Sequence, residues 1–201
     1  MSSTSPQGGG ESAGRIVAIA RSWIGTPYVH QASVKDVGCD CLGLLRGVWR
    51  ELRGEEPEAA PPYSPDWAEA TGRETLREAL ARHLAEISPC EAEGEPVPAR
   101  GRGAARAALF ELLQPGDVAL FRMSPRGPAK HCGIVASRAR SIEAPRVILR
   151  SERSQRLEGR AGRLRMTRAD LTLIHARQNK RVSEEPFSPF WLKKLAFAFR
   201  I

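Results

Sequence analysis

Apolar residues in the first half of the chain recur every three or four positions, which is the period of one face of a helix. This spacing predicts helices over about 12–23, 41–53 and 66–87. Gly25 and Gly54 follow the first two and are suited to end them. The apolar stripes of the three predicted helices are Ile16, Ile19, Ala20 and Trp23; Leu44, Leu45, Val48 and Trp49; and Trp67, Leu76, Leu80 and Leu84.

The second half of the chain predicts strands, because its apolar runs are short and lie between turn-forming residues. These runs cover 117–121, 131–137, 146–149 and 171–175. Helices followed by antiparallel strands are typical of an α+β fold and not of a doubly wound sheet. We therefore expect N-terminal helices packed on a small antiparallel sheet.

Segments in which apolar residues have no regular spacing lie before, within and after one predicted domain. We expect the domain over 12–185, preceded by a disordered leader at 1–11 and followed by a segment at 186–201 that closes the fold or docks a partner. Within the domain, residues 88–108 are predicted to form a mobile loop and the Arg-rich stretch 138–168 an exposed insertion. A chain of 201 residues, 41% of them hydrophobic, is long enough to bury a core.

The formal net charge of +8 suits a polyanionic partner, but free use of Arg codons in a GC-rich genome explains it as well. No aromatic residues are interleaved with the basic ones, so we expect no nucleic-acid partner. Four cysteines are too few for a disulfide scaffold. The polar N-terminus has no signal-peptide pattern, and no apolar run reaches the length of a membrane span. We therefore expect reduced thiols, synthesis in the cytoplasm and no membrane insertion.

Cys41 follows Gly38, Cys39 and Asp40 and opens the second predicted helix. The free amides and partial positive charge of a helix N-terminus stabilise a thiolate, and the same amides can donate to an oxyanion. Gly43 allows the close approach of substrate or of a packed strand. Cys41 is therefore a candidate nucleophile, although a small buried core residue is the commoner role of a single cysteine.

A thiol nucleophile needs a base within hydrogen-bonding reach and a third polar group that orients the base. His131, at the start of a predicted strand, is the candidate base. His175, at the end of a later strand, is the candidate orienting residue. Each could also be an ordinary surface or core histidine. His30 lies in the loop before Cys41 and is expected to line the site without acting in it.

Other catalytic chemistries lack their sequence patterns in this chain. There is no CxxC, HxxxH or HExxH spacing for a metal, and no glycine-rich phosphate loop after a strand. There is also no GxSxG nucleophile elbow. We therefore expect neither a metal nor a cofactor.

Four segments, in order, resemble those of the NlpC-type cell-wall peptidases, a branch of the papain-like fold. GTPYVHQASVKDVGCDCLGL is similar to the family's Gly-x-Pro-Tyr segment leading into Gly-Phe-Asp-Cys-Ser-Gly-Leu. LQPGDVALF, HCGIV and LTLIHA are similar to its Leu-x-Pro-Gly-Asp-Leu, His-Val-Gly-Ile-Tyr and Phe-Ile-His-Ala strands. The resemblance covers roughly 12–54 and 111–185, and it implies the papain-like NlpC-type fold.

The resemblance also implies roles for individual residues. Cys41 would attack the scissile carbonyl, His131 would hold the proton and His175 would orient His131. Tyr28, with the Cys41 amide, would stabilise the oxyanion. Asp40 would meet the free amine of a peptidoglycan stem peptide. The implied reaction is cleavage of that peptide between D-glutamate and the diamino acid.

Three features depart from the family pattern. Leu42 replaces the usual serine after the nucleophile, and Cys39 replaces the usual phenylalanine. His131 and His175 are 44 residues apart, farther than is usual in the family. The Arg-rich insertion must therefore loop out if both histidines serve one site.

GCDCLGLLRGVWREL, PPYSPDWAE and PFWLKKLAFAFRI resemble the subgroup encoded in tail-gene clusters of phages and gene transfer agents. This implies an enzyme that binds tail or baseplate proteins in the cytoplasm and is carried by the particle to the periplasm or cell wall of a target cell. One alternative is a catalytically weak structural tail-tip protein on the same fold, which Leu42 and the insertion favour. Another is an amidase or acyltransferase, which an apolar groove would favour.

Overall fold

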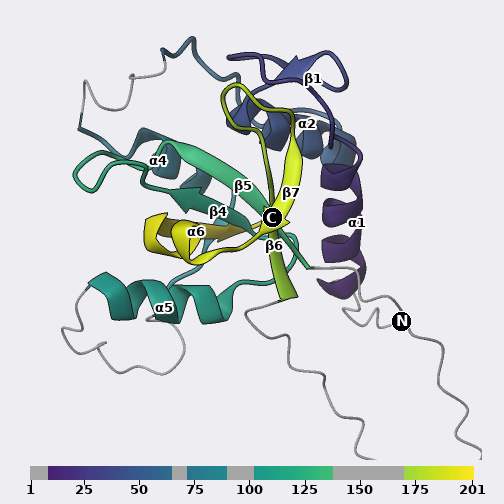
Figure 1. Cartoon of the computed structure of the whole chain (residues 1–201). Coiled ribbons are helices and arrows are strands. Elements are labelled where there is room, and N and C mark those ends of the chain that lie inside the picture. The colour runs from purple at the N-terminus through teal and green to yellow at the C-terminus, as the bar shows by residue number, and fades with distance from the viewer. Residues whose placement is uncertain (1–8, 65–71, 90–101, 138–169) are drawn as a thin grey trace, which may run out of the picture.

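The computed structural model describes residues 9–64, 72–89, 102–137 and 170–201 (Figure 1). Its helices are α1 (Gly9–Arg21), α2 (Cys41–Arg53), α4 (Thr75–Ala81), α5 (Arg102–Leu112) and α6 (Pro189–Lys194). Its strands are β1 (Ser33–Val34), β2 (Gly38–Cys39), β3 (Ala85–Glu86), β4 (Val118–Phe121), β5 (His131–Ser137), β6 (Leu171–His175), β7 (Ser183–Pro186) and β8 (Leu195–Arg200). None of the described helices is long and apolar enough to cross a membrane.

Six of the strands form one antiparallel sheet in the order β3-β8-β4-β5-β6-β7, and β1 and β2 form a separate two-stranded ribbon. The expected α+β arrangement of N-terminal helices on a small antiparallel sheet is confirmed. The predicted bounds of α2, β5 and β6 are confirmed to the residue, and β4 begins one residue later than expected.

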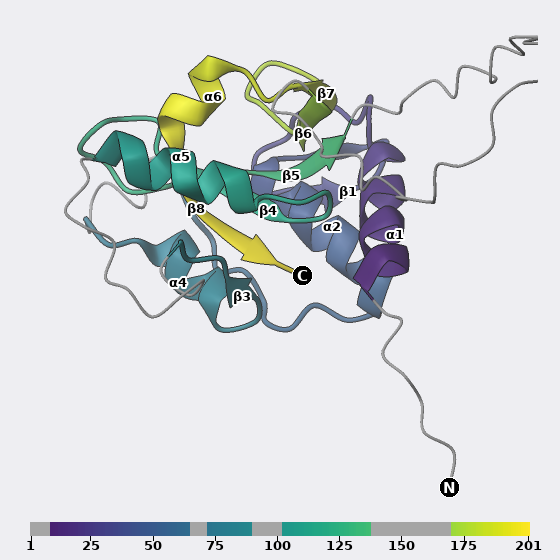
Figure 2. The ribbon, with the colours of Figure 1, turned by 90° about the horizontal axis from the view of Figure 1, so that it is seen from below.

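Side chains that alternate along the strands divide the core between the two faces of the sheet. Cys132 and Ile134 of β5 face α1, α2 and α4. Cys132 packs with leucines of α2 and α4, and Ile134 packs with Ile16 of α1 and Leu44 of α2. Val135 faces the opposite side, which α5 and α6 cover through Phe110 and Trp191. Figure 2 shows α5 crossing over β4 and β8 on that side. The sheet is therefore covered on both faces, and its strand ends remain available for a site.

The third predicted helix is shorter than expected, because α4 begins at Thr75 and ends at Ala81. Positions 66–71 of that prediction lie outside the described residues. Ala85 and Glu86 instead pair with β8 as strand β3. Leu84 keeps a buried position after the helix has ended, so helical spacing in the sequence continues beyond the helix itself. Strand pairing has overridden the periodic pattern here.

The prediction of a mobile loop over 88–108 is wrong for its last part, since α5 begins at Arg102. Leu109 and Phe110 at the end of α5 are buried against the sheet, and this burial stabilises a helix whose earlier turns are largely exposed. The first eight residues of the predicted leader, the predicted strand at 146–149 and the Arg-rich insertion at 138–168 lie outside the described residues. Helix α1 begins at Gly9, three residues before the predicted start.

The C-terminal segment closes the fold with the short helix α6 and the strand β8. Strand β8 lies between β3 and β4, and Ala198 and Phe199 of that strand are completely buried. The sequence LAFAFR alternates small and large apolar residues, which suits a strand with neighbours on both sides. Trp191, Leu195, Ala198 and Phe199 are thus part of the core, whereas Phe190 is 51% exposed, and docking of a partner by this segment stays a prediction.

Candidate active site

A cleft of about 390 Å³ lies where the start of α2 meets the start of β5. Of the predicted site residues, Cys41, His131, Tyr28 and Asp40 line it. His175 is completely buried behind His131, and Gly43 is buried away from the cleft. The other lining residues are His30, Tyr63, Ser64, Met123, Lys130, Ala176, Arg177, Gln178 and Trp191.

Cys41 is the first residue of α2, so its sulfur lies at the positive end of the helix. The residue that follows His131, Cys132, reaches Cys41 from the adjacent strand, and its Sγ lies 3.2 Å from the Cys41 carbonyl oxygen. Hydrogen bonding from the Cys132 side chain, and then from His131, lowers the pKa of the Cys41 thiol well below its usual value, although burial opposes this shift. The same contact and burial raise the pKa of Cys132. Cys41 is therefore the thiol of the cleft that is poised to ionise.

The two predicted catalytic histidines form a pair. His131 Nε2 lies 2.9 Å from His175 Nδ1, which leaves His131 Nδ1 for Cys41. Gly133 makes this pairing possible, because a Cβ atom there would come within 3.0 Å of the His175 Cβ and 2.7 Å of Leu173. The structure thus brings Cys41, His131 and His175 together despite their distance in sequence.

Two residues that the sequence did not single out for the site surround the histidine pair. Trp191 of α6 stacks on His131, with ring centroids 5.3 Å apart and planes inclined by 25°. Glu185 of β7 places Oε1 3.2 Å from His175 Nε2, a buried nitrogen that has no aligned hydrogen bond within the described residues. Trp191 was visible only as part of an aromatic-rich C-terminus, and Glu185 carried no signal in the sequence.

Burial, and after it the positive charges of His131, Arg177 and Lys180, lower the pKa of His175 to about 3. His175 is therefore neutral in the folded protein, so it can orient the base without competing with it for a proton. In this role it differs from His131, which lines the cleft with Cys41 and helps to lower the pKa of the thiol.

The unusual pKa of His175 predicts acid sensitivity of the fold. An unfolded histidine titrates near 6.5, so the unfolded chain gains a proton that the folded chain does not bind as the pH falls from 6.5 to about 3. His175 should lower the free energy of unfolding by about 1.4 kcal/mol per pH unit in that window. Urea unfolding of wild type and His175→Asn at several pH values checks this. An equally steep loss of stability in both proteins would contradict it.

Asp40 caps α2 and is almost completely engaged by the protein. Oδ1 accepts from the Gly43 amide at 2.7 Å, and Oδ2 accepts from the Gln31 amide and the Tyr63 hydroxyl at 2.7 and 2.5 Å. His30 Nδ1 lies 3.5 Å from the same oxygen, and Asp40 is only 2% exposed. This geometry favours a role in holding the start of α2, and the predicted contact with a substrate amine remains a prediction.

Gly43 serves the fold and not the cleft. A Cβ atom there would lie 1.8 Å from the carbonyl oxygen of Ala32, so the close approach expected at this glycine is made by the loop before β1. The same carbonyl accepts from the Asp40 amide. The predicted substrate-binding role of Gly43 is thus corrected to one of packing.

Gly43→Ala should destabilise the protein by about 3 kcal/mol, because the backbone of the loop would have to move. Gly14→Ala is the matched control. Gly14 lies in α1 with nothing near its would-be Cβ, and alanine there should stabilise the helix by about 0.5–1 kcal/mol. Urea unfolding followed by circular dichroism measures both changes. A Gly43→Ala protein as stable as wild type would show that the loop yields without cost.

Tyr28 lies in the cleft beside the nucleophile, as predicted. Burial, and then the negative charges of Cys41 and Asp40, raise the pKa of Tyr28 to about 12. Its hydroxyl therefore keeps its proton and can donate a hydrogen bond to an oxyanion. Tyr63, from the connector before α4, is a further phenol at the cleft, and burial together with its bond to Asp40 raises its pKa.

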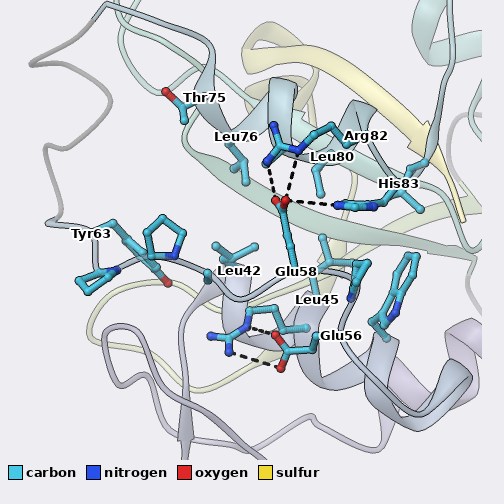
Figure 3. A pocket seen from close by; sticks show the side chains of 18 residues that line it. Leu42, Leu45, Glu56, Glu58, Tyr63, Thr75, Leu76, Leu80, Arg82 and His83 are labelled. Carbon is cyan, nitrogen blue, oxygen red and sulfur yellow. Dashed lines mark hydrogen bonds and ion pairs between the residues drawn. The ribbon is translucent and has the colours of Figure 1, made fainter.

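A second, mainly apolar cavity of about 180 Å³ lies next to the cleft and shares Tyr63 with it. Leu42 and Leu45 of α2 form one wall, and Leu76 and Leu80 of α4 form the opposite wall (Figure 3). The charged side chains around it are paired with each other, Arg82 with Glu58 and Arg46 with Glu56. Leu42, which stands where the family usually has a serine, thus forms part of the wall of this apolar cavity.

Within the described part of the chain, no group of three or more histidine, cysteine or acidic side chains could hold a metal ion. The three described cysteines, Cys39, Cys41 and Cys132, are all free thiols. Burial raises the pKa of Cys39 to about 12. The chemistry that the cleft offers is therefore that of one activated thiol, a histidine base and protonated phenols.

No protein-family model matches the sequence, and no curated protein matches it. Among solved structures, the chain is similar to the NlpC/p60 domain of the peptidoglycan hydrolase SagA, with 22% identity, 94% of this chain and 98% of that chain covered, and a TM-score of 0.47. It is also similar to a protein described as similar to lipoprotein, NLP/P60 family, from Staphylococcus aureus subsp. aureus Mu50, with 17% identity and a TM-score of 0.49. That match covers 100% of this chain and 45% of the other chain.

Proposed function

We propose that the protein is a cysteine peptidase of the NlpC type that hydrolyses the peptide stems of bacterial peptidoglycan. The observation that carries this proposal is the joining of three groups at one cleft. Cys41 lies at a helix N-terminus, His131 lines the same cleft and lowers the pKa of the thiol, and a buried neutral His175 lies 2.9 Å behind His131. This is the arrangement that thiol acyl transfer requires.

In the proposed reaction the Cys41 thiolate attacks the scissile carbonyl carbon and forms a C–S bond. The oxyanion accepts hydrogen bonds from the Cys41 backbone amide and the Tyr28 hydroxyl. His131 then donates its Nδ1 proton to the leaving amine, and the C–N bond breaks. A water molecule then gives a proton to His131 and attacks the thioester carbon. The C–S bond breaks, which releases the acid and restores the Cys41 thiolate beside a protonated His131.

The cleft suits a charged peptide. Lys130 and Arg177 line it and place positive charge near the thiol, and stem peptides carry carboxylates. Cleavage between D-glutamate and the diamino acid is the specificity that the resembling sequence segments imply. Resemblance of three segments to tail-cluster peptidases supports the further proposal that a phage-like or gene transfer agent particle carries the protein, bound to tail or baseplate proteins, to the periplasm of a target cell.

Digestion of purified peptidoglycan, with the products identified by mass spectrometry, tests the proposal. We expect soluble fragments with a new amino terminus at the diamino acid. Fragments cut instead at the bond between sugar and peptide would show that the protein is an amidase and not a peptidase. No fragments from any wall type would leave the structural tail-tip alternative.

The apolar cavity beside the cleft favours a second candidate, an acyltransferase or amidase that takes an apolar group. Leu42 directly follows the nucleophile and lines that cavity, so an acyl chain bound there would lie close to the thiol. Comparing Cys41-dependent hydrolysis of 4-nitrophenyl acetate and 4-nitrophenyl octanoate distinguishes the two candidates. A marked preference for the longer chain, without digestion of peptidoglycan, would favour the second.

A further inference from the structure

The carboxylate of Glu185 lies within hydrogen-bonding distance of three side chains, those of His175, Trp191 and Arg177. His175 Nε2, at the end of β6, lies 3.2 Å from Oε1 of Glu185. Trp191 of α6 donates its indole N–H to the same oxygen, and Arg177 Nη2 donates to Oε2 at 3.3 Å. Both carboxylate oxygens are thus held in place, and one of them faces the buried side of the histidine pair.

The position of this carboxylate decides which nitrogen of His175 carries the proton. A neutral imidazole has one N–H and one lone pair. With the N–H on Nε2, the proton lies on the nitrogen that is 3.2 Å from the negatively charged Glu185 carboxylate. With the N–H on Nδ1, the Nε2 lone pair would face that carboxylate without water to separate them, since His175 is completely buried.

The tautomer of His175 determines which hydrogen bond His131 can make with it. When His175 carries its proton on Nε2, its Nδ1 lone pair accepts from the Nε2–H of His131. His131 then presents Nδ1 to Cys41, and it can hold protons on both nitrogens while the thiol is ionised. In the other tautomer two N–H groups would face each other across 2.9 Å whenever His131 is protonated.

We propose that Glu185 is a positioning residue that fixes the tautomer of His175, and through it the orientation of His131 toward Cys41. Trp191 shares in this role, because it binds the same carboxylate oxygen and also stacks on the His131 ring. The inference rests on the proposed thiol chemistry of the cleft but not on any particular substrate.

The wild-type protein gives the first test. Nitrogen-15 chemical shifts of the His175 ring distinguish the two neutral tautomers without any substitution. We expect the Nε2–H form between pH 6 and 8. Observation of the Nδ1–H form would overturn the proposal, whether or not any variant folds.

Variants give the second test, read out by the rate at which iodoacetamide alkylates Cys41 as a function of pH. Glu185→Leu should lower the rate at pH 6 about tenfold and move the profile to higher pH. Glu185→Gln should keep most of the rate, because its amide oxygen can still accept from Nε2. Glu184→Leu is the matched control on the same strand, because Glu184 binds Arg21 and Thr172 instead.

The outcomes separate this proposal from the proposed function. A Glu185→Leu protein that folds, as judged by circular dichroism, and keeps the wild-type alkylation profile would overturn the role of Glu185. A shifted profile in a protein that digests no peptidoglycan would leave that role intact and count against the substrate alone.

Discussion

Cys41→Ala is expected to abolish digestion of peptidoglycan while leaving the fold intact. The sulfur is the only atom removed, and alanine suits the first turn of a helix. The cap on α2 does not depend on the thiol, because Asp40 provides it through the Gly43 amide. Mass spectrometry of the digestion products, with circular dichroism and the unfolding midpoint of the variant, measures both parts of this prediction. Soluble fragments should fall to the level of a reaction without enzyme.

Two comparisons make the result specific to Cys41. Cys90→Ala should leave the activity unchanged, since the sequence assigns no chemistry to that residue, which lies outside the described part of the chain. Iodoacetamide at pH 6 should label Cys41 in preference to Cys39 and Cys132, because the pKa values of the latter two are raised. Activity retained by Cys41→Ala would show that the nucleophile is wrongly assigned.

The second large effect is expected at the histidine pair, where His131→Ala should cost more than His175→Ala. His131 exchanges the proton with thiol and leaving group, so its loss should lower the rate of digestion about 10⁴-fold. His175 acts through His131, and its loss should cost about 10²-fold. His175→Asn should recover part of that loss, because an amide oxygen can accept from His131 Nε2.

Initial rates of fragment release, measured at matched concentrations of folded protein, decide the order of these effects. The double variant should be little slower than His131→Ala alone, since residues that act as a unit are not additive. If His175→Ala proved the slower of the single variants at equal stability, His175 and not His131 would have to be the base.

Helix α2 could be predicted to the residue because several independent signals agree there. An apolar stripe and a terminal Gly54 marked its bounds in the sequence, and the structure adds a cap from Asp40 and a φ of 91° at Gly54. Helix α4 could not, because Leu84 continues the helical spacing while the backbone turns to pair with β8. In the C-terminal segment, Trp191 and Leu195 are four residues apart and favour a helix, whereas the structure divides them between α6 and β8.

The residues of the candidate site could also be predicted only in part. Cys41, His131 and His175 were identified because each lies at the end of a predicted element within a segment that resembles a known one. Glu185 was missed because a glutamate in SEEP on an edge strand has the pattern of a solvent-facing residue. Its role depends on contacts with β6 and α6 that only the tertiary structure creates.

The position of β8 has a consequence for the order of events during synthesis. Residues 195–200 are made after every other strand of the sheet, yet they lie between β3 and β4. Trp191, which stacks on His131, is made only just before them. A nascent chain from which residues 189–200 have not yet emerged therefore has β3 and β4 without their shared neighbour and His131 without Trp191. We expect the proposed nucleophile to reach its full reactivity only after this last segment has joined the sheet.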